Sequence, residues 1–181
     1  MSIWRPEFEA ALELFASVSA TVVQRGFPAP VLVGGAAVEL YSGSAIATGD
    51  FDLVTARQDS VEQALQDHGF VKPLGPGRLT RGWIHPDLKL GFEVVGSALL
   101  EGRAEQARVR LIDVSAGDQF AVISVEDLIA DRMGQYGSGT APEMLGQAQT
   151  LFRLYRGQDD SYLERRIREE TSNDYGIDDI L

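Results

Sequence analysis

Two aspartates separated by one residue, Asp50 and Asp52, are the strongest candidates for chemistry in the sequence. They introduce the apolar stretch FDLVT, which is typical of a strand. Side chains two residues apart in a strand point to the same face, so both carboxylates should project together while Phe51 enters the core. Two close carboxylates repel each other unless a cation lies between them, and Mg²⁺ suits such a pair together with substrate phosphates. The simpler alternative is a pair of solvated acids at a strand edge.

The double glycine Gly34-Gly35 is the second candidate feature. It follows Val31-Leu32-Val33, a short apolar run that predicts a buried strand, and it precedes a predicted helix. Free N–H groups at a helix start can hold an anion, and glycine lets a phosphate approach the backbone closely. On its own the pattern is more typical of an ordinary tight turn. Its position one short helix and one loop before the acidic pair predicts a phosphate cradle beside the metal ligands.

Glu93 is a third acid in a place that favours function. In LKLGFEVVG, alternation puts Leu90, Phe92 and Val94 on one face and Glu93 on the other. An acid within an otherwise apolar strand is costly unless it is paired or bound to a metal. Three carboxylates could hold two Mg²⁺ ions, one activating an acceptor hydroxyl and one holding a leaving pyrophosphate. The alternative is an ion pair with a nearby cation: Arg78, Arg81 or Lys89.

The elements that must position these residues predict a mixed α/β (α+β) fold, a β-sheet flanked by helices, with further helices at the C-terminus. Hydrophobic periodicity and turn residues predict strands over 31–33, 51–55, 78–85, 88–96, 107–114 and 119–123. They predict helices over 6–25, 36–41, 60–68, 125–136, 142–156 and 160–170, with Asp59-Ser60 and Ser124 as N-caps. We expect residues 1–123 to form the core and residues 124–181 a helical region packed on it.

Composition narrows the partners without naming one. The 181 residues carry a formal charge of −11, which argues against a protein that coats nucleic acid non-specifically. Fourteen of the 16 basic residues are arginine, so a local phosphate-binding patch remains compatible with that charge. There are no cysteines, no apolar run that could span a membrane and no signal-peptide pattern at the start. A soluble, cytoplasmic protein without disulfides is expected.

The three motifs together resemble the polymerase-β-like nucleotidyltransferase superfamily, which carries a Gly-Gly or Gly-Ser turn, then Asp-x-Asp, then a later acid on another strand. The stretches GGAAVELY, S-x-x-x-T-G-D-F-D-L and ISVEDLIADRM are more narrowly similar to the small abortive-infection (AbiEii-like) branch, several members of which are toxins of toxin–antitoxin pairs. The resemblance covers about residues 30–135. It implies a nucleotidyltransferase-type fold and transfer of a nucleoside monophosphate (NMP) from a nucleoside triphosphate (NTP).

The same resemblance assigns roles to individual positions. It implies that Asp50 and Asp52 bind two Mg²⁺ ions and that Glu93 completes the catalytic and metal site as ligand or base. It implies that Arg132, where relatives often carry lysine, touches phosphate, with an ordinary salt-bridged helix arginine as the alternative. The remaining nucleotide-binding positions that it implies are Gly34, Gly35, Ser44 and Thr48.

One position departs from the family pattern. Relatives commonly have a basic residue two positions before the threonine of the T-x-D-x-D stretch, and this chain has Ile46 there. Either the substrate is unusual, or activity is reduced, or another arginine substitutes: Arg5, Arg78 or Arg81. We therefore expect an Mg²⁺-dependent nucleotidyltransferase with a hydroxyl acceptor that is RNA or tRNA, a protein or a small molecule, and with an antitoxin as a partner if it is a toxin. The alternative is a catalytically weakened binding or regulatory module on the same fold.

Overall fold

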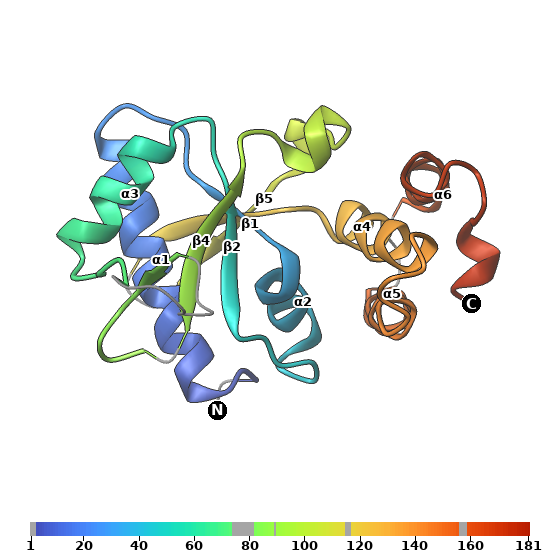
Figure 1. The fold of residues 1–181 in the computed structure, drawn as a ribbon, viewed down its shortest axis with the longest axis horizontal. Helices are drawn as coiled ribbons and strands as arrows, with labels where there is room; N and C mark the ends of the chain where they lie inside the picture. Colours follow the sequence, from blue (N-terminus) through green and yellow to red (C-terminus); the bar gives the residue numbers. More distant parts are fainter. Residues whose placement is uncertain (1–2, 74–81, 89, 115–116, 156–158) are drawn as a thin grey trace.

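A six-stranded mixed β-sheet forms the centre of the structure (Figure 1). The computed structural model describes residues 3–73, 82–88, 90–114, 117–155 and 159–181. The strand order across the sheet is β3-β4-β2-β1-β6-β5. The strands are β1 (Val31–Val33), β2 (Asp50–Val54), β3 (Trp83–Ile84), β4 (Gly91–Gly96), β5 (Arg110–Asp113) and β6 (Gln119–Val122).

The pairing of the strands places the ends of β1, β2 and β4 side by side. β2 runs antiparallel to β1 and parallel to β4, while β1 runs parallel to β6. The edge strands β3 and β5 are antiparallel to their neighbours β4 and β6. A mixed sheet with helices on both faces is the α/β architecture that the sequence predicts, and this expectation is confirmed.

Helices cover both faces of the sheet. On one side lie α1 and α3, and on the other α2 and the C-terminal helices (Figure 1). The helices are α1 (Pro6–Gln24), α2 (Gly34–Ser42), α3 (Gln58–Asp67), α4 (Val125–Gly137), α5 (Met144–Leu154) and α6 (Asp160–Glu170). Three short 3-10 turns complete the described chain: η1 (Leu99–Gly102), η2 (Gln106–Arg108) and η3 (Ile177–Asp179). No helix in the described ranges is long and apolar enough to cross a membrane.

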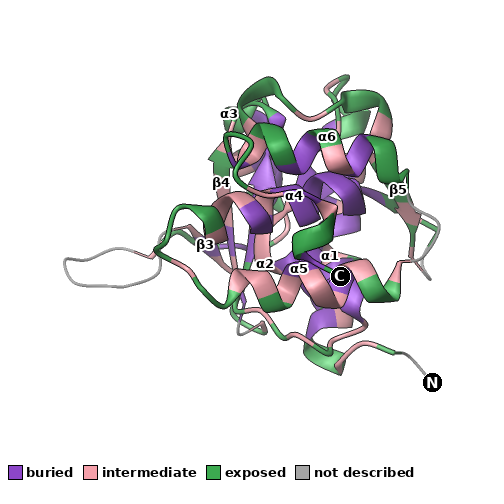
Figure 2. Cartoon of the chain, turned by 90° about the vertical axis from the view of Figure 1, so that its right-hand side faces the viewer, coloured by how far each residue is buried: buried purple, intermediate pink, exposed green. Residues whose placement is uncertain are grey.

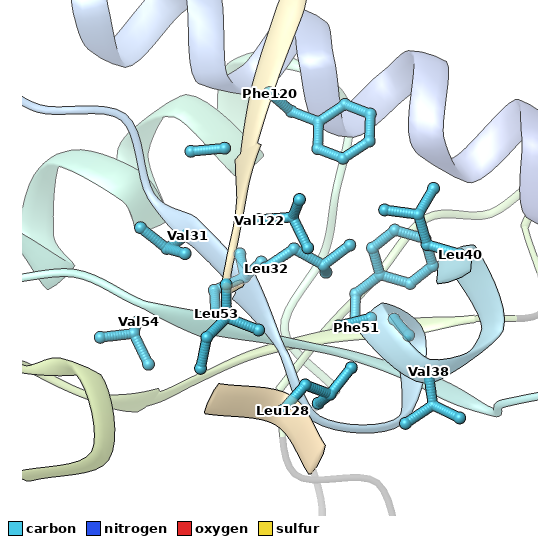
Figure 3. Packing of buried hydrophobic residues seen from close by; sticks show 14 of the residues in the cluster. Val31, Leu32, Val38, Leu40, Phe51, Leu53, Val54, Phe120, Val122 and Leu128 are labelled. Atoms are coloured by element: carbon cyan, nitrogen blue, oxygen red, sulfur yellow. The ribbon is translucent and has the colours of Figure 1, made fainter. Parts of the chain in front are cut away.

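Aromatic packing holds α1 on the sheet. Phe51 of β2 stacks on Phe92 of β4 with ring centroids 4.5 Å apart, and Phe15 of α1 packs against both rings. All three side chains are fully buried. Figure 3 shows Phe51, Leu53 and Phe120 among the apolar side chains around the central strands. Because Phe51 and Leu53 go into this layer, the residues that alternate with them on β2 must face the opposite side.

The C-terminal helices form a second packed layer beside α2. α4 is largely buried and contacts both α5 and α6 (Figure 2). Asp127, in the first turn of α4, is 1% exposed and accepts a hydrogen bond from Nε of the fully buried Arg166 of α6 at 2.7 Å. Leu128 and Ile129 belong to the same apolar cluster as Val122 of β6. The expected division between residues 123 and 124 falls in the connection between β6 and α4, and it stays a prediction.

Several element ends differ from the predictions, and each difference has a local cause. The second helix begins at Gly34 rather than at residue 36, because the glycines themselves form its first turn. α3 has Arg57 as its N-cap without a side-chain hydrogen bond, so the predicted cap at Asp59-Ser60 is wrong. The strand predicted over 88–96 begins at Gly91, since the N–H of Leu88 bonds the carbonyl of His85 in the preceding turn. Residues 78–81 of the preceding predicted strand lie outside the described residues.

Candidate active site

Asp50 and Asp52 lie on the face of β2 that is turned away from α1. Phe51 and Leu53 are fully buried on the opposite face, as the two-residue period predicts. Asp50 is the first residue of the strand and is exposed, while Asp52 is half-buried. Neither carboxylate has a hydrogen bond or an ion pair with any of the described residues, so the pair is available to a ligand.

Glu93 is the direct neighbour of Asp52 across the sheet. The parallel pairing of β2 and β4 sets Asp52 opposite Glu93 and Asp50 opposite Gly91. Glu93 is half-buried, and its carboxylate has no partner among the described residues. The cations that could pair with it in the alternative interpretation are Arg78, Arg81 and Lys89, which lie outside the described residues. The structure therefore gathers the three predicted carboxylates on one face of two adjacent strands.

The surroundings raise the pKa of Asp52 to about 6. Burial is the largest cause, and the negative charges of Asp50 and Glu93 add to it, while Arg132 acts in the opposite direction. Partial burial beside two like charges favours the protonated acid. A cation bound between the carboxylates would reverse this preference, because it would neutralise the charges that oppose ionisation.

The glycine turn lies so close to the acids that a residue with a Cβ would not fit there. β1 ends at Val33, which pairs with Asp52, and Gly34 continues into α2 with a φ of +64°. A Cβ on Gly34 would lie 2.2 Å from Oδ2 of Asp52, and one on Gly35 would lie 2.5 Å from Oγ1 of Thr48. The first turn of α2 has no side-chain cap. Its N–H groups are the type of donor that binds phosphate at a helix start.

A cavity of about 610 Å³ opens beside Asp52 between the sheet and α4. Three predicted site residues, Gly34, Asp52 and Arg132, contribute to its wall. Its apolar lining comes from Val33, Val54, Val95, Ala98, Leu100, Ile123 and Leu128, and its further polar lining from Gly96, Ser97, Glu101, Asp131 and Gln135. This volume lies within the range of small-ligand pockets, and its lining combines apolar side chains with a few polar and charged ones.

Arg132 lines this cavity but is already engaged. Its side chain is buried, and Nε and Nη2 donate to Oδ2 of Asp131 at 3.1 and 2.6 Å. Nη1 lies 3.4 Å from the sulfur of Met144. The arginine lines the cavity and forms the ion pair of the alternative interpretation, while its contact with phosphate stays a prediction.

Two predicted nucleotide-binding residues, Ser44 and Thr48, have structural partners within the chain, and their binding of a nucleotide stays a prediction. The hydroxyl of Ser44 donates to Oε1 of Glu39 at 2.8 Å and accepts from the N–H of Arg5 at 3.1 Å. Thr48 donates its N–H to Oε2 of Glu39 and accepts at its carbonyl from Arg5. Neither residue lines the cavity. The role of Ser44 and Thr48 that the structure shows is to hold the loop before β2.

The replacement of a basic residue by Ile46 is not compensated by Arg5. Ile46 packs partly buried against the apolar core. The guanidinium of Arg5 is held by Glu39 and by the carbonyl of Thr48, so it is not free for a phosphate. The other two candidates, Arg78 and Arg81, lie outside the described residues.

The cavity also contains residues that sequence reasoning did not single out. Asp131 and Gln135 follow Leu128 of α4 at helical spacing, so all three face the same side, and this spacing was a usable signal. Glu101 comes from the loop after β4, where it and Leu100 have φ values of 57° and 44°. No motif in the sequence indicated that this loop turns back over the strand ends.

The carboxylates suit a metal ion that also binds substrate. Among the described residues no group of three or more His, Cys, Asp or Glu side chains is arranged closely enough to hold a metal ion, so the predicted set of three ligands is not preformed. Mg²⁺ usually takes one or two carboxylates and completes its octahedron with water and substrate phosphates. Asp50 and Asp52 beside the open start of α2 fit that requirement.

Comparisons with known proteins place the fold among nucleotidyltransferases. Eleven chains of solved structures match this one. The crystal structure of ANT(2'')-Ia in complex with adenylyl-2''-tobramycin has a TM-score of 0.58 and 19% identity, covering 90% of this chain and 98% of that one. The solution structure of the antibiotic-resistance factor ANT(2'')-Ia gives 0.56 and 18%, covering 90% and 92%. An antigenic nucleotidyltransferase-like protein from Paracoccidioides brasiliensis gives 0.59 and 15%, covering 93% and 88%.

No protein-family model and no curated protein matches the sequence. At these identities the likeness shows the fold alone. The nucleotidyltransferase-type architecture that the motifs predict is thereby confirmed, while the abortive-infection branch stays a prediction.

Proposed function

We propose that this protein is a nucleotidyltransferase that moves an NMP group from an NTP to a hydroxyl acceptor. The observation that carries the proposal is the half-buried, unpartnered carboxylate of Asp52 directly beneath the Gly34 turn, with Glu93 opposite it in register. If this position had only a structural role, an apolar or hydrogen-bonded side chain would cost less free energy to bury than an unpaired carboxylate. The fold shared with ANT(2'')-Ia supports the same activity.

In the proposed reaction, groups of this chain bind the triphosphate, hold the metal ion and accept a proton. The first N–H groups of α2, at Gly34 and Gly35, bind the triphosphate, and Asp50 and Asp52 hold Mg²⁺. Bound Mg²⁺ would neutralise the phosphate oxygens and make the acceptor hydroxyl more acidic. Glu93 accepts the proton of the acceptor hydroxyl while the oxygen of that hydroxyl bonds to the α-phosphorus of the NTP. The bond from that phosphorus to the β-phosphate oxygen breaks, and pyrophosphate leaves.

The walls of the cavity favour a cationic acceptor over RNA. Three acids line it, Asp52, Glu101 and Asp131, and Arg132 is the one cation among the described lining residues. The Arg132 guanidinium and the Asp131 carboxylate form an ion pair and neutralise each other, so Asp52 and Glu101 leave the wall with net negative charge. A phosphodiester chain would be repelled by this wall, whereas an amine-bearing hydroxyl compound would be attracted. ANT(2'')-Ia, which shares the fold, is known in complex with adenylyl-2''-tobramycin, and this supports a small-molecule acceptor.

A binding module without catalysis is the second candidate. Its support is Ile46 at the position where relatives carry a basic residue, together with the engagement of Arg5 in a structural ion pair. In that case the acids would be retained for stability or partner binding, and Mg²⁺–NTP would not bind. An antitoxin partner and a toxin function have no support beyond the sequence resemblance, and they stay predictions.

Calorimetric titration with ATP, CTP, GTP and UTP in Mg²⁺ separates the two candidates. The enzyme predicts saturable binding of at least one NTP that is lost in Asp52→Asn. A matched control is Asp174→Asn, because Asp174 is exposed in a C-terminal turn, away from β2. Binding that is absent from the wild type, or that persists unchanged in Asp52→Asn, would overturn the proposal.

A further inference from the structure

Glu39 is a buried carboxylate in the stretch GGAAVELY, and the sequence assigned it no role. It lies in α2 and is 0% exposed. Nε of Arg5 donates to its Oε1 at 2.6 Å and Nη2 donates to Oε2 at 3.1 Å. Burial acts to raise the pKa of Glu39, but hydrogen bonds from Arg5, Thr48 and Ser44 hold it below its usual value. The Arg5 side chain is 32% exposed, so the desolvation cost falls on Glu39, and the hydrogen bonds that the carboxylate accepts offset that cost.

The Arg5–Glu39 pair grips the peptide groups on both sides of Thr48. The N–H of Thr48 donates to Oε2 of Glu39 at 2.6 Å, and its carbonyl accepts from Nη2 of Arg5 at 2.7 Å. A second attachment comes from Ser44, whose hydroxyl donates to Oε1 of Glu39 at 2.8 Å. The loop between α2 and β2, residues 43–49, is thus tied down at two points by one ion pair.

Thr48 connects this pair to both parts of the candidate active site. Its Oγ1 donates to the carbonyl of Asp50 at 3.2 Å and accepts from the N–H of Asp50 at 3.5 Å. The same oxygen lies 2.5 Å from the place that a Cβ on Gly35 would occupy. Any movement of Thr48 therefore changes the distance between the glycine turn and the first acid.

Asp50 benefits from such support because its carboxylate, which lies over Gly91, has no hydrogen bond or ion pair with the described residues. It is exposed at the first position of β2, and two further carboxylates, Asp52 and Glu93, face the same side. Mutual repulsion of three acids drives the outermost one away from the others. Pairing with Gly91 of β4 holds Asp50 on the strand side, and the backbone before Asp50, which resists the displacement from the other side, is the segment that the ion pair holds.

We propose that Arg5 and Glu39 are positioning residues that set Asp50 and Asp52 against the Gly34-Gly35 turn by clamping the Thr48 peptide groups. The inference rests on the proposed function, since it gives the clamp a purpose in metal–nucleotide binding. It also gives a reason why Arg5, which precedes the first helix and lies outside every motif, faces α2. The competing interpretation is an ion pair that only fastens α1 to α2.

The test compares Glu39→Gln with Asp127→Asn. Both changes neutralise a buried carboxylate bound to an arginine, but Asp127 serves the contact between α4 and α6. The first measurement is amide hydrogen exchange of the metal-free, nucleotide-free protein. In Glu39→Gln the N–H of Thr48 should exchange at least about tenfold faster, since a hydrogen bond to a charged acceptor is lost. In Asp127→Asn it should be unchanged once the rates are compared at equal global stability.

The second measurement is binding of Mn²⁺ with a non-hydrolysable ATP analogue, followed by electron paramagnetic resonance. Glu39→Gln should weaken Mn²⁺ binding by about tenfold while Asp127→Asn does not, because a displaced carboxylate loses much of its metal interaction. Arg5→Lys, which keeps the charge but only part of the hydrogen bonding, should fall between wild type and Glu39→Gln.

Two results would overturn the positioning role. One is an unchanged Thr48 exchange rate in Glu39→Gln, and the other is Mn²⁺ affinity that falls no further than in Asp127→Asn. Failure of the wild type to bind Mn²⁺ with nucleotide would instead overturn the proposed function. The exchange experiment still decides in that case whether the pair holds Thr48, so the two failures are distinguishable.

Discussion

Replacing Asp52 by asparagine should stabilise the metal-free protein at neutral pH while removing its nucleotide binding. Asparagine has nearly the same shape as aspartate but no charge. The carboxylate of Asp52 has no hydrogen-bond partner among the described residues, so the change breaks no contact there. It removes the repulsion from Asp50 and Glu93 and the cost of keeping a charge half-buried.

The size of the effect follows from the pKa of Asp52, which rises from 3.8 to about 6 on folding, chiefly through burial and then through Asp50 and Glu93. At about 1.4 kcal/mol for each pH unit, this corresponds to at most about 3 kcal/mol. Because Asp52 is partly exposed, solvent screening reduces the expected gain to about 1–2 kcal/mol. For a domain of this length that raises the midpoint of thermal unfolding by about 2–8 °C.

The gain should depend on pH in a defined direction. The folded protein binds a proton at Asp52 more tightly than the unfolded chain does, so wild-type stability falls as the pH rises from 3.8 to about 6. Above that window the penalty is complete, and below it both states are protonated. Asp52→Asn should therefore be more stable than wild type at pH 7–8 and equal to it below pH 4.

Urea unfolding of both proteins in chelator, from pH 4 to pH 8, measures this difference. Adding Mg²⁺ and NTP at pH 8 should then stabilise the wild type and leave Asp52→Asn unchanged, because only the wild type binds the ligand. The reasoning is refuted if Asp52→Asn is no more stable than wild type at pH 8 in chelator. A stability gap that does not close towards pH 4 would refute the role of ionisation even if the sign is right.

Three further predictions test other parts of the structure. Gly34→Ala forces a Cβ to 2.2 Å from Oδ2 of Asp52 at a φ of +64°. It should cost about 1–2 kcal/mol in urea unfolding and weaken Mg²⁺–NTP binding in calorimetry, whereas Gly146→Ala, with open space around it in α5, should do neither. Arg166→Met leaves buried carboxylates without their cation and should cost about 3–5 kcal/mol of unfolding free energy, with unchanged NTP affinity of the folded fraction. Glu101→Gln removes a cavity-wall charge whose side chain is 89% exposed, so KM for a cationic acceptor should rise only about two- to fivefold, and not at all in high salt. An effect of Glu101→Gln on NTP affinity instead would contradict the assignment of that wall to the acceptor.

The predictions from sequence were reliable where one local rule decided the outcome. The two-residue period of strands placed Asp50 and Asp52 on one face and Phe51 on the other, and the structure agrees. Ser124 is the N-cap of α4 because its hydroxyl accepts the N–H of Asp127, as the capping pattern predicts. Local rules were less reliable at element ends, where a turn or a 3-10 segment competes with the strand. Gln106–Arg108 form such a 3-10 turn, so the strand that was predicted to begin at residue 107 begins at Arg110.

The sequence by itself determined the chemistry of the site: two acids in strand register, a glycine turn that needs no Cβ, and Glu93 on the polar face of an apolar strand. The tertiary structure decided which of these groups meet. The neighbourhood of Asp52 and Glu93 depends on the parallel pairing of β2 with β4, which joins segments about forty residues apart. The role of Arg5 depends on Glu39, which is 34 residues away in the sequence. An arginine side chain can bind either a phosphate or a carboxylate, and the packing of the N-terminal segment on α2 selects the carboxylate of Glu39. Pairings of this kind follow from long-range packing, which no local pattern of residues encodes.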